Sequence, residues 1–183
     1  MKKNSGFTLL EVALVTVILG IVAGLTFLKF MNTTAQDQLQ KAANNLYIEI
    51  RGLRPLCFKY DEAVMVTFDD NNSKLEIYID QNDDEKIQAA ELYKEYVLPS
   101  PVIIGSCETD PDTWVYGEKP KKGLTNEWQD MLTVLPDARG EYAHGGVYIN
   151  VPSLKTVTYF IGITTSMQSI ELFKWTGSSW IKL

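Results

Sequence analysis

The feature that most constrains this chain is a long apolar run that directly follows a short basic N-terminus. Met1–Gly6 is polar and contains two lysines, whereas Phe7–Phe30 is apolar apart from small residues, hydroxyl residues, Glu11 and Lys29. As a helix with a rise of about 1.5 Å per residue, this run is long enough to cross a bilayer core of roughly 30 Å. Lysines before a span favour a cytoplasmic N-terminus. The run therefore predicts one membrane span, with the remainder of the chain on the outer side of the membrane.

Two other kinds of N-terminal segment compete with this interpretation. A secretory signal peptide has a shorter apolar core, roughly 7–15 residues, followed by a cleavage site of small residues. The run here is longer, and Phe27–Phe30 offers no such site. An ordinary membrane anchor is compatible with the hydropathy, so another feature has to separate the alternatives.

That feature is Glu11, a carboxylate inside the apolar run. A charged side chain at such a position costs roughly 2.5–3.5 kcal/mol on insertion scales, so membrane segments seldom carry one without a partner. No basic residue lies nearby along the helix, because Lys2 and Lys3 precede the span and Lys29 is near its far end. The partner of Glu11 is therefore expected to come from another molecule.

The residues around Glu11 resemble a known motif. Gly6–Val12 reads GFTLLEV and is similar to the prepilin motif G-F-T-L-[IL]-E-[VLM] of type IV pilins and type II secretion pseudopilins. The resemblance implies that a prepilin peptidase cuts after Gly6 and N-methylates Phe7. It also implies that Glu11 neutralises the terminal amine of Phe7 on a neighbouring subunit. The implied partners are other pilin or pseudopilin subunits, the peptidase and inner-membrane lipid.

The helical pattern continues beyond the apolar run. Apolar residues recur at spacings of three and four, which predicts one buried stripe. The stripe consists of Ala35, Leu39, Ala42, Ala43, Leu46, Ile50 and Leu53. Pro55 disfavours helix in the residue before it, so one helix is expected over residues 7–54. The predicted organisation is a leader (1–6), a transmembrane or filament-core half-helix (7–30), an amphipathic half-helix (31–54) and a β-rich domain (55–183).

The β-rich domain is predicted from short runs of β-branched and aromatic residues separated by turn residues. The expected strands are Ala63–Phe68, Lys74–Ile79, Val102–Ile104, Met131–Leu135, Gly146–Val151, Val157–Ile163, Ile170–Trp175 and Trp180–Leu183. Cys107–Asn126 is expected to be a long loop. The fold class is α+β, with a long N-terminal helix packed on an antiparallel β-domain, as in pilins.

The order of features in the β-rich domain resembles the GspH/FimT-like minor pilins and pseudopilins. In that family a hairpin leads into an acidic D-x-N-x-D turn, an acidic residue and a short apolar segment. Here the hairpin is Val64–Ile79, the turn starts at Asp80, and Glu91-Leu92 follows. The resemblance implies a minor subunit that helps to initiate or cap a type IV pilus or a type II secretion pseudopilus. A major pilin and a GspG-like subunit remain alternatives.

Other functional classes have less support. The chain lacks a G-x-S-x-G elbow, a Walker loop and an HExxH motif, and it has one histidine, His144, so enzymatic activity is not expected. A net charge of −6 disfavours nucleic acid as a partner, although Lys119–Lys122 could contact phosphate. The alternative function is a tip-exposed pilin that binds DNA, a surface or a secreted substrate. The expected location is the inner membrane, with a periplasmic C-terminal domain, and then the filament.

The two cysteines have two possible states. Cys57 and Cys107 both follow the predicted span and would face an oxidising periplasm, where a disulfide could form. The alternative is a pair of buried thiols. No spacing of cysteine and histidine predicts a zinc site.

The acidic turn resembles a calcium-binding loop in the spacing of its oxygen ligands. The candidate ligands are Asp80, Asn82, Asp84, the Lys86 carbonyl, Gln88 and Glu91. Two features oppose a site: Glu85 replaces the usual glycine, and the loop follows a strand, Lys74–Ile79, instead of a helix. Ca²⁺ is thus the one candidate cofactor, and a solvated acidic turn is the alternative.

Overall fold

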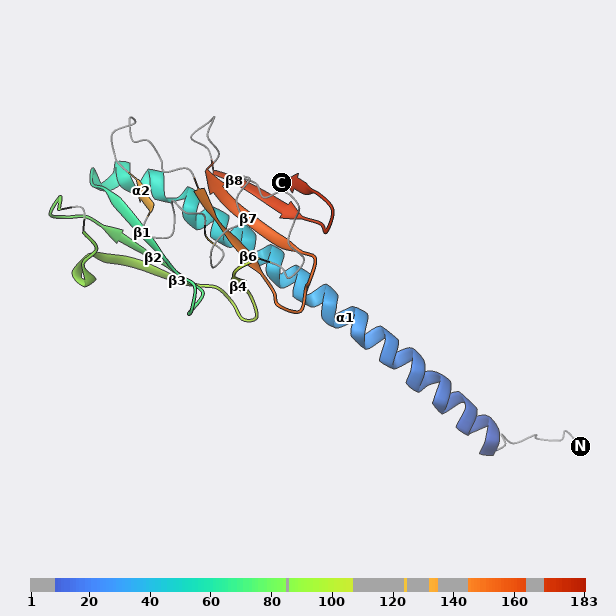
Figure 1. Ribbon diagram of the computed structural model, residues 1–183. Helices are drawn as coiled ribbons and strands as arrows, with labels where there is room; N and C mark the ends of the chain where they lie inside the picture. The colour runs from blue at the N-terminus through green and yellow to red at the C-terminus, as the bar shows by residue number, and fades with distance from the viewer. Residues whose placement is uncertain (1–8, 85, 107–123, 125–131, 135–144, 164–169) are drawn as a thin grey trace, which may run out of the picture. The chain divides into compact units, whose positions relative to one another are not determined.

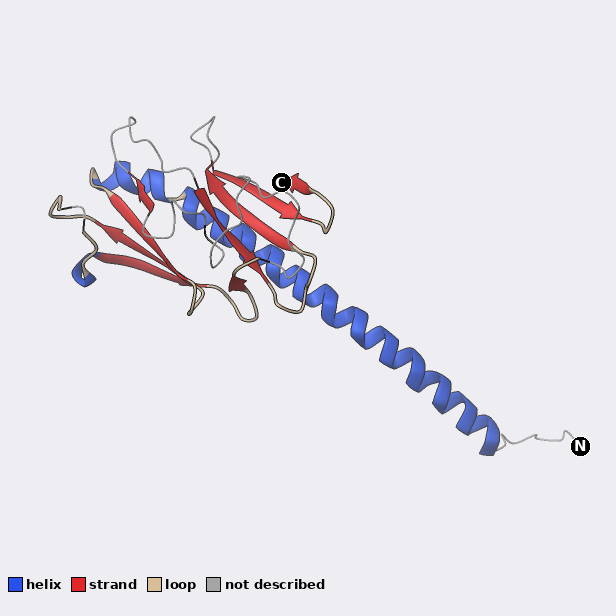
Figure 2. Cartoon of the chain, viewed as in Figure 1, coloured by secondary structure: helices blue, strands red, loops and turns tan. Residues whose placement is uncertain are grey.

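The structure, a computed structural model, describes residues 9–84, 86–106, 124, 132–134, 145–163 and 170–183 (Figure 1). The chain divides into two compact units, Met1–Thr34 and Ala35–Leu183. Helix α1 is Leu9–Arg51 and helix α2 is Leu53–Tyr60, and strands and one short 3-10 helix follow (Figure 2). The predicted α+β class is confirmed.

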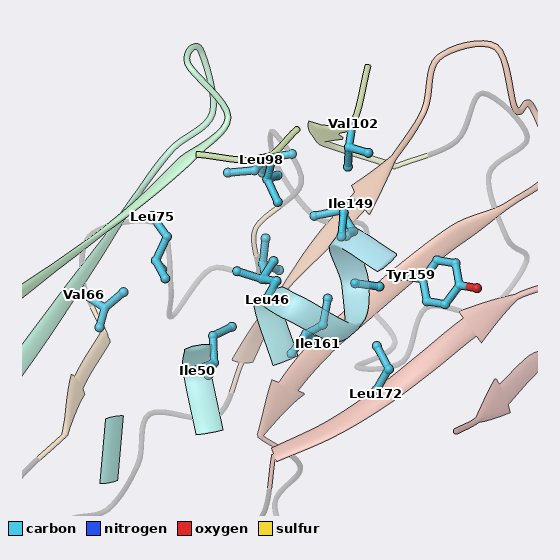
Figure 3. Packing of buried hydrophobic residues seen from close by; sticks show 14 of the residues in the cluster. Leu46, Ile50, Val66, Leu75, Leu98, Val102, Ile149, Tyr159, Ile161 and Leu172 are labelled. Carbon is cyan, nitrogen blue, oxygen red and sulfur yellow. The ribbon is translucent and has the colours of Figure 1, made fainter. Parts of the chain in front are cut away.

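The predicted apolar stripe is confirmed as part of the core, on the second half of α1 and, at Leu53, on the first residue of α2. All of its members are buried except Ala35, which is partly buried against the others. Leu46 and Ile50 lie at the centre of the cluster, between side chains of two sheets (Figure 3). Because the side chains recur on one face of the helix, this half of α1 contributes a continuous apolar surface to the core.

The end of the helix differs from the prediction. The chain leaves α1 at Gly52, whose N–H bonds to the Ile48 and Glu49 carbonyls, and then continues into α2. Pro55 lies in the first turn of α2. Backbone N–H groups have no partner inside the helix at that position, so proline is tolerated there. Pro55 therefore does not end the helical region, which continues to Tyr60 and is closed by Asp61 in a left-handed conformation.

Two antiparallel sheets complete the second unit. The first has the order β3-β2-β1-β5, formed by Leu92–Val97, Lys74–Ile79, Val64–Asp69 and Leu132–Val134. The second has the order β4-β6-β7-β8-β9, formed by Ile103–Ile104, Gly145–Asn150, Thr158–Ile163, Ile170–Trp175 and Trp180–Lys182. Sequential strands pair with each other in most places, so the connections are hairpins.

One hydrophobic core joins α1 to both sheets. Val66 and Leu75 of the first sheet, and Ile149 and Ile161 of the second, belong to the same buried cluster as Leu46 (Figure 3). The alternation of side chains along a strand explains why each sheet directs every second residue to this core. The β2–β3 loop therefore lies at one end of the first sheet, which packs on the helix through this core.

Strand β3 is an element that the sequence did not predict. Leu92–Val97 reads LYKEYV, in which two charges interrupt the apolar pattern, and most of its residues are exposed. It pairs with β2 at the edge of the first sheet, with an irregularity opposite Ile77 and Tyr78. Charged residues are typical of edge strands, because they oppose pairing with further chains. Lys94 also lies 2.7 Å from Glu49 of α1, which ties the edge to the helix.

A polar network covers the outer face of this sheet. Lys74 Nζ lies 2.6 Å from Glu76 Oε1 and 3.2 Å from Glu95 Oε2. Tyr78 donates a hydrogen bond to the other oxygen of Glu76 at 3.0 Å. These donors stabilise the ionised carboxylate, so the hydrogen bond from Lys74, opposed in part by burial, holds the pKa of Glu76 below its ordinary value of 4.5.

We expect this network to make stability depend on acidity. Because the pKa of Glu76 is lowered in the folded state, its contribution is complete above pH 4.5 and is lost as the pH falls through the lowered pKa. Glu76→Gln should remove about 0.5–1 kcal/mol at neutral pH and flatten the acid side of the profile. Thermal unfolding between about pH 3 and pH 7 measures this. Glu95→Gln is the matched control, and an equal effect of both variants would contradict the assignment.

Candidate functional site

The first half of α1 presents apolar side chains around its whole circumference. Leu9 is 89% exposed in the single chain, and the other large apolar residues of this segment are also exposed. They are Leu10, Val12, Leu14, Val15, Val17, Ile18, Leu19, Ile21 and Val22. A helix that is apolar on every side is stable only when lipid or other protein surrounds it. This surface, Leu9–Val22, is therefore a candidate contact surface for other molecules.

The hydroxyl residues in this part of α1 bond to the helix itself. Thr16 Oγ1 donates to the Ala13 carbonyl at 2.8 Å, and Thr26 Oγ1 donates to the Val22 carbonyl at 2.8 Å. A hydroxyl whose partner is a carbonyl of its own helix can enter an apolar environment without losing a hydrogen bond. The threonines are thus compatible with complete burial of the surface.

Glu11 is the only acidic residue of the first turn of α1, and it is exposed. The partial positive charge at a helix N-terminus favours a carboxylate at this place. The charge is therefore compatible with the helix. Burying it away from water still requires a nearby cation to offset the cost of desolvation. Gly6 and Phe7, the predicted cleavage and methylation residues, lie outside the described residues, so their roles stay predictions.

Within the described part of the chain, no helix is both long enough and apolar enough to qualify as a membrane span.

The second candidate site is the acidic β2–β3 loop, Asp80–Glu91. Its side-chain oxygens accept bonds from backbone N–H groups that follow in the chain. Asp84 N donates to Asn82 Oδ1 at 3.1 Å and to Asp80 Oδ1 at 3.3 Å. Lys86 N donates to Asp84 Oδ1 at 3.0 Å. These turns wind the backbone around the side chains that the spacing predicted as the first three cation ligands.

Glu91 closes this loop from its far end. The 3-10 helix η1, Ala89–Glu91, turns the chain so that Glu91 Oε1 accepts from Gln81 N at 3.3 Å. Glu91 is 7% exposed and Asp80 is 1% exposed. The spacing predicted both residues as ligands. It could not reveal that the Gln81 N–H positions Glu91, because every residue except proline supplies a backbone N–H. Among the residues placed by the structure, no group of three His, Cys, Asp or Glu side chains could hold a metal ion.

The remaining predicted site residues are the two cysteines, the histidine and a lysine cluster. Cys57 is buried in α2, and burial raises the pKa of its thiol. Cys107 lies outside the described residues, so the disulfide stays a prediction. His144 and the lysines at 119–122 also lie outside the described residues.

Comparison with known families identifies the N-terminus. Residues 1–27 match the prokaryotic N-terminal methylation motif. This motif is typical of type IV pilins and pseudopilins, and it indicates a type IV pilin-like protein that prepilin peptidase processes and that assembles with other pilin subunits. No curated protein and no solved structure matches the chain.

Proposed function

We propose that this protein is a minor pilin or pseudopilin that helps to initiate or cap a type IV pilus or a type II secretion pseudopilus. Its role is structural, and we propose no enzymatic activity. Before assembly, residues 7–30 anchor it in the inner membrane, with the N-terminus in the cytoplasm and the C-terminal domain in the periplasm. After cleavage, the same helix packs among the helices of other subunits.

The observation that carries the proposal is the apolar surface Leu9–Val22 with Glu11 in its first turn. Such a surface in water would be far larger than the apolar patches of ordinary monomers. A filament core and a lipid bilayer both cover it on all sides, so one helix can serve in both environments. A second subunit supplies what lipid does not, a terminal amine to neutralise Glu11.

The minor role is proposed from the second unit. Its order of features, a hairpin of β1 and β2 followed by the acidic loop and a short apolar segment, resembles GspH/FimT-like subunits. Subunits that start or end a filament need the same N-terminal helix as the subunits between them. The resemblance in the β-domain is therefore what distinguishes this proposal from a major pilin.

Mass spectrometry of the membrane-bound protein tests the processing step. The full chain, expressed with a prepilin peptidase, is expected to start at Phe7 and to carry one added methyl group. Gly6→Val should leave the precursor intact, because a side chain at this position obstructs approach of the protease to the backbone. Ser5→Ala is the matched control in the leader and should be processed normally.

An intact Met1 on protein recovered from filaments would contradict the proposal. So would normal processing of Gly6→Val, because the peptidase would then not recognise the predicted site.

A further inference from the structure

The β2–β3 loop contains a buried carboxylate oxygen for which the described residues provide no hydrogen-bond donor. Glu91 is 7% exposed, and its Oε1 accepts the Gln81 N–H at 3.3 Å. Its Oε2 is buried, and no donor for it exists among the described residues. Burial of an acceptor without a partner costs free energy, so such an atom in a native structure requires an explanation, and a bound cation supplies one. The bond to Gln81 holds this carboxylate against the beginning of the acidic loop.

We propose that Asp80–Glu91 binds one Ca²⁺ ion with low affinity and that the ion connects the end of β2 to the start of β3. The ligands are the side-chain oxygens of Asp80, Asn82 and Asp84, the Lys86 carbonyl, Gln88 and the carboxylate of Glu91. This site goes beyond the proposed filament function and does not depend on it.

The chemistry of these donors selects the cation. The loop offers carboxylate, amide and carbonyl oxygens but no histidine or cysteine, which is the ligand set of a hard cation. The carboxylates of Asp80, Asp84 and Glu91 do not form a metal-binding group in this structure, so they must move closer to one another when the ion binds, and amide and carbonyl oxygens complete the coordination. Ca²⁺ accepts six to eight oxygens of these mixed kinds in flexible geometry, whereas Mg²⁺ requires a stricter octahedron.

The loop is partly arranged for the ion. Asn82 Oδ1 and Asp84 Oδ1 each accept the N–H two residues further on, at 3.1 Å and 3.0 Å. Asp84 N also donates to Asp80 Oδ1 at 3.3 Å, so hydrogen bonds link the first, third and fifth ligand positions within one turn of the chain. The segment also holds five acidic residues and one lysine, so a divalent cation would relieve repulsion between them.

Three features keep the affinity low. The Gln88 amide donates to Asp84 Oδ2 at 2.9 Å, and an ion that takes this oxygen must displace the bond. The left-handed residue is Asp83, at φ 55°, and no glycine is present to ease the turn. The single turn of η1 replaces the long second helix of the usual calcium loop. We therefore expect a dissociation constant of about 10⁻⁴–10⁻³ M, the range of extracellular modules.

Equilibrium dialysis and thermal unfolding of the full chain in detergent micelles test the site, with CaCl₂ as the probe and EGTA as the reference. We expect one bound Ca²⁺ per chain. At about 10 mM Ca²⁺ the ratio of folded to unfolded protein should rise about 10- to 100-fold. MgCl₂ at the same concentration should have a much smaller effect.

Glu91→Gln and Asp84→Asn should each weaken Ca²⁺ binding at least about 10-fold, because each removes a ligand charge. Asp83→Asn is the matched control. It removes the same charge from the same loop at an exposed position outside the ligand set, and asparagine tolerates a left-handed backbone. Its affinity should stay within about twofold of the unaltered protein.

Glu91→Gln gives a second readout that a structural role alone would not produce. In EGTA it should melt no lower than the unaltered protein, because it removes a buried charge, yet it should lose the stabilisation by Ca²⁺. If this variant does not fold, dialysis of the unaltered protein and of Asp84→Asn decides the question. Absence of binding at about 10 mM Ca²⁺, equal stabilisation by Mg²⁺, or equal losses in Asp83→Asn and Asp84→Asn would each overturn the proposal.

Discussion

Gly162→Ala is expected to disrupt the folding of the second unit. Gly162 of β7 lies directly opposite Gly146 of β6. A Cβ at Gly162 would lie 2.3 Å from the Gly145 carbonyl oxygen, 2.9 Å from the Gly146 Cα and 2.5 Å from Phe160 Cζ. Two of these atoms belong to the backbone of the paired strand, so a change of rotamer cannot relieve the contact. Overpacking of a core costs typically 1–3 kcal/mol, and we expect about 3 kcal/mol or more here.

The same pair of glycines explains the position of Phe160. Its ring lies over them on the face of β7 where Tyr148 of β6 also packs, with ring centroids 4.6 Å apart. Both aromatic residues are fully buried. The absence of side chains at Gly146 and Gly162 thus makes room for an aromatic layer on the sheet.

Thermal unfolding and limited proteolysis of the full chain measure the effect of Gly162→Ala. Gly20→Ala is the control for the substitution, because a Cβ at Gly20 meets nothing within 4 Å. In the middle of a helix, alanine is more stable than glycine by roughly 0.5–1 kcal/mol. A normal melting temperature for Gly162→Ala would show that β6 and β7 can separate enough to accept the methyl group, contrary to the expectation.

Glu11→Val is expected to impair assembly strongly while leaving membrane insertion and processing intact. Valine removes the cost of a carboxylate in lipid, so insertion should be as efficient or better. In the filament, however, the terminal amine of the neighbouring subunit would lose its partner. Breaking a buried ion pair costs about 3–5 kcal/mol, and each 1.4 kcal/mol changes an equilibrium tenfold. We expect the share of the protein in sheared filaments to fall at least about tenfold.

Thr16→Val is the matched control on the same surface. It also replaces a polar side chain by valine, but the Thr16 hydroxyl bonds to carbonyls of its own helix, so its loss should not affect contacts between subunits. Quantitative immunoblots of sheared filaments and membranes compare the two variants. Equal incorporation of Glu11→Val and Thr16→Val would show that the charge has no role between subunits.

Local patterns predicted much of the fold. The stripe from Leu39 to Leu53 was correct because helical spacing alone decides which side chains share a face. Two strands, Lys74–Ile79 and Ile170–Trp175, have the predicted bounds, since each is a short apolar run between turn residues. The N-terminal motif was recognised in the same way, from residues adjacent in the chain.

Predictions that depended on distant residues were less successful. Pro55 indicated the end of a helix, but its position in the first turn of α2 removes the conflict. Strand β3 was missed because its charges conceal its pairing with β2, and pairing depends on an edge that only the assembled sheet creates.

For the candidate sites, the sequence by itself determined the apolar N-terminal surface, Glu11 and the spacing of oxygen ligands in the acidic loop. Each of these is a matter of residue type and separation along the chain. Only the tertiary structure decided that Glu91 is buried and that one of its oxygens lacks a donor. Burial depends on how η1 turns back toward Gln81 and on the core beneath the sheet, and these contacts join residues that no local pattern relates.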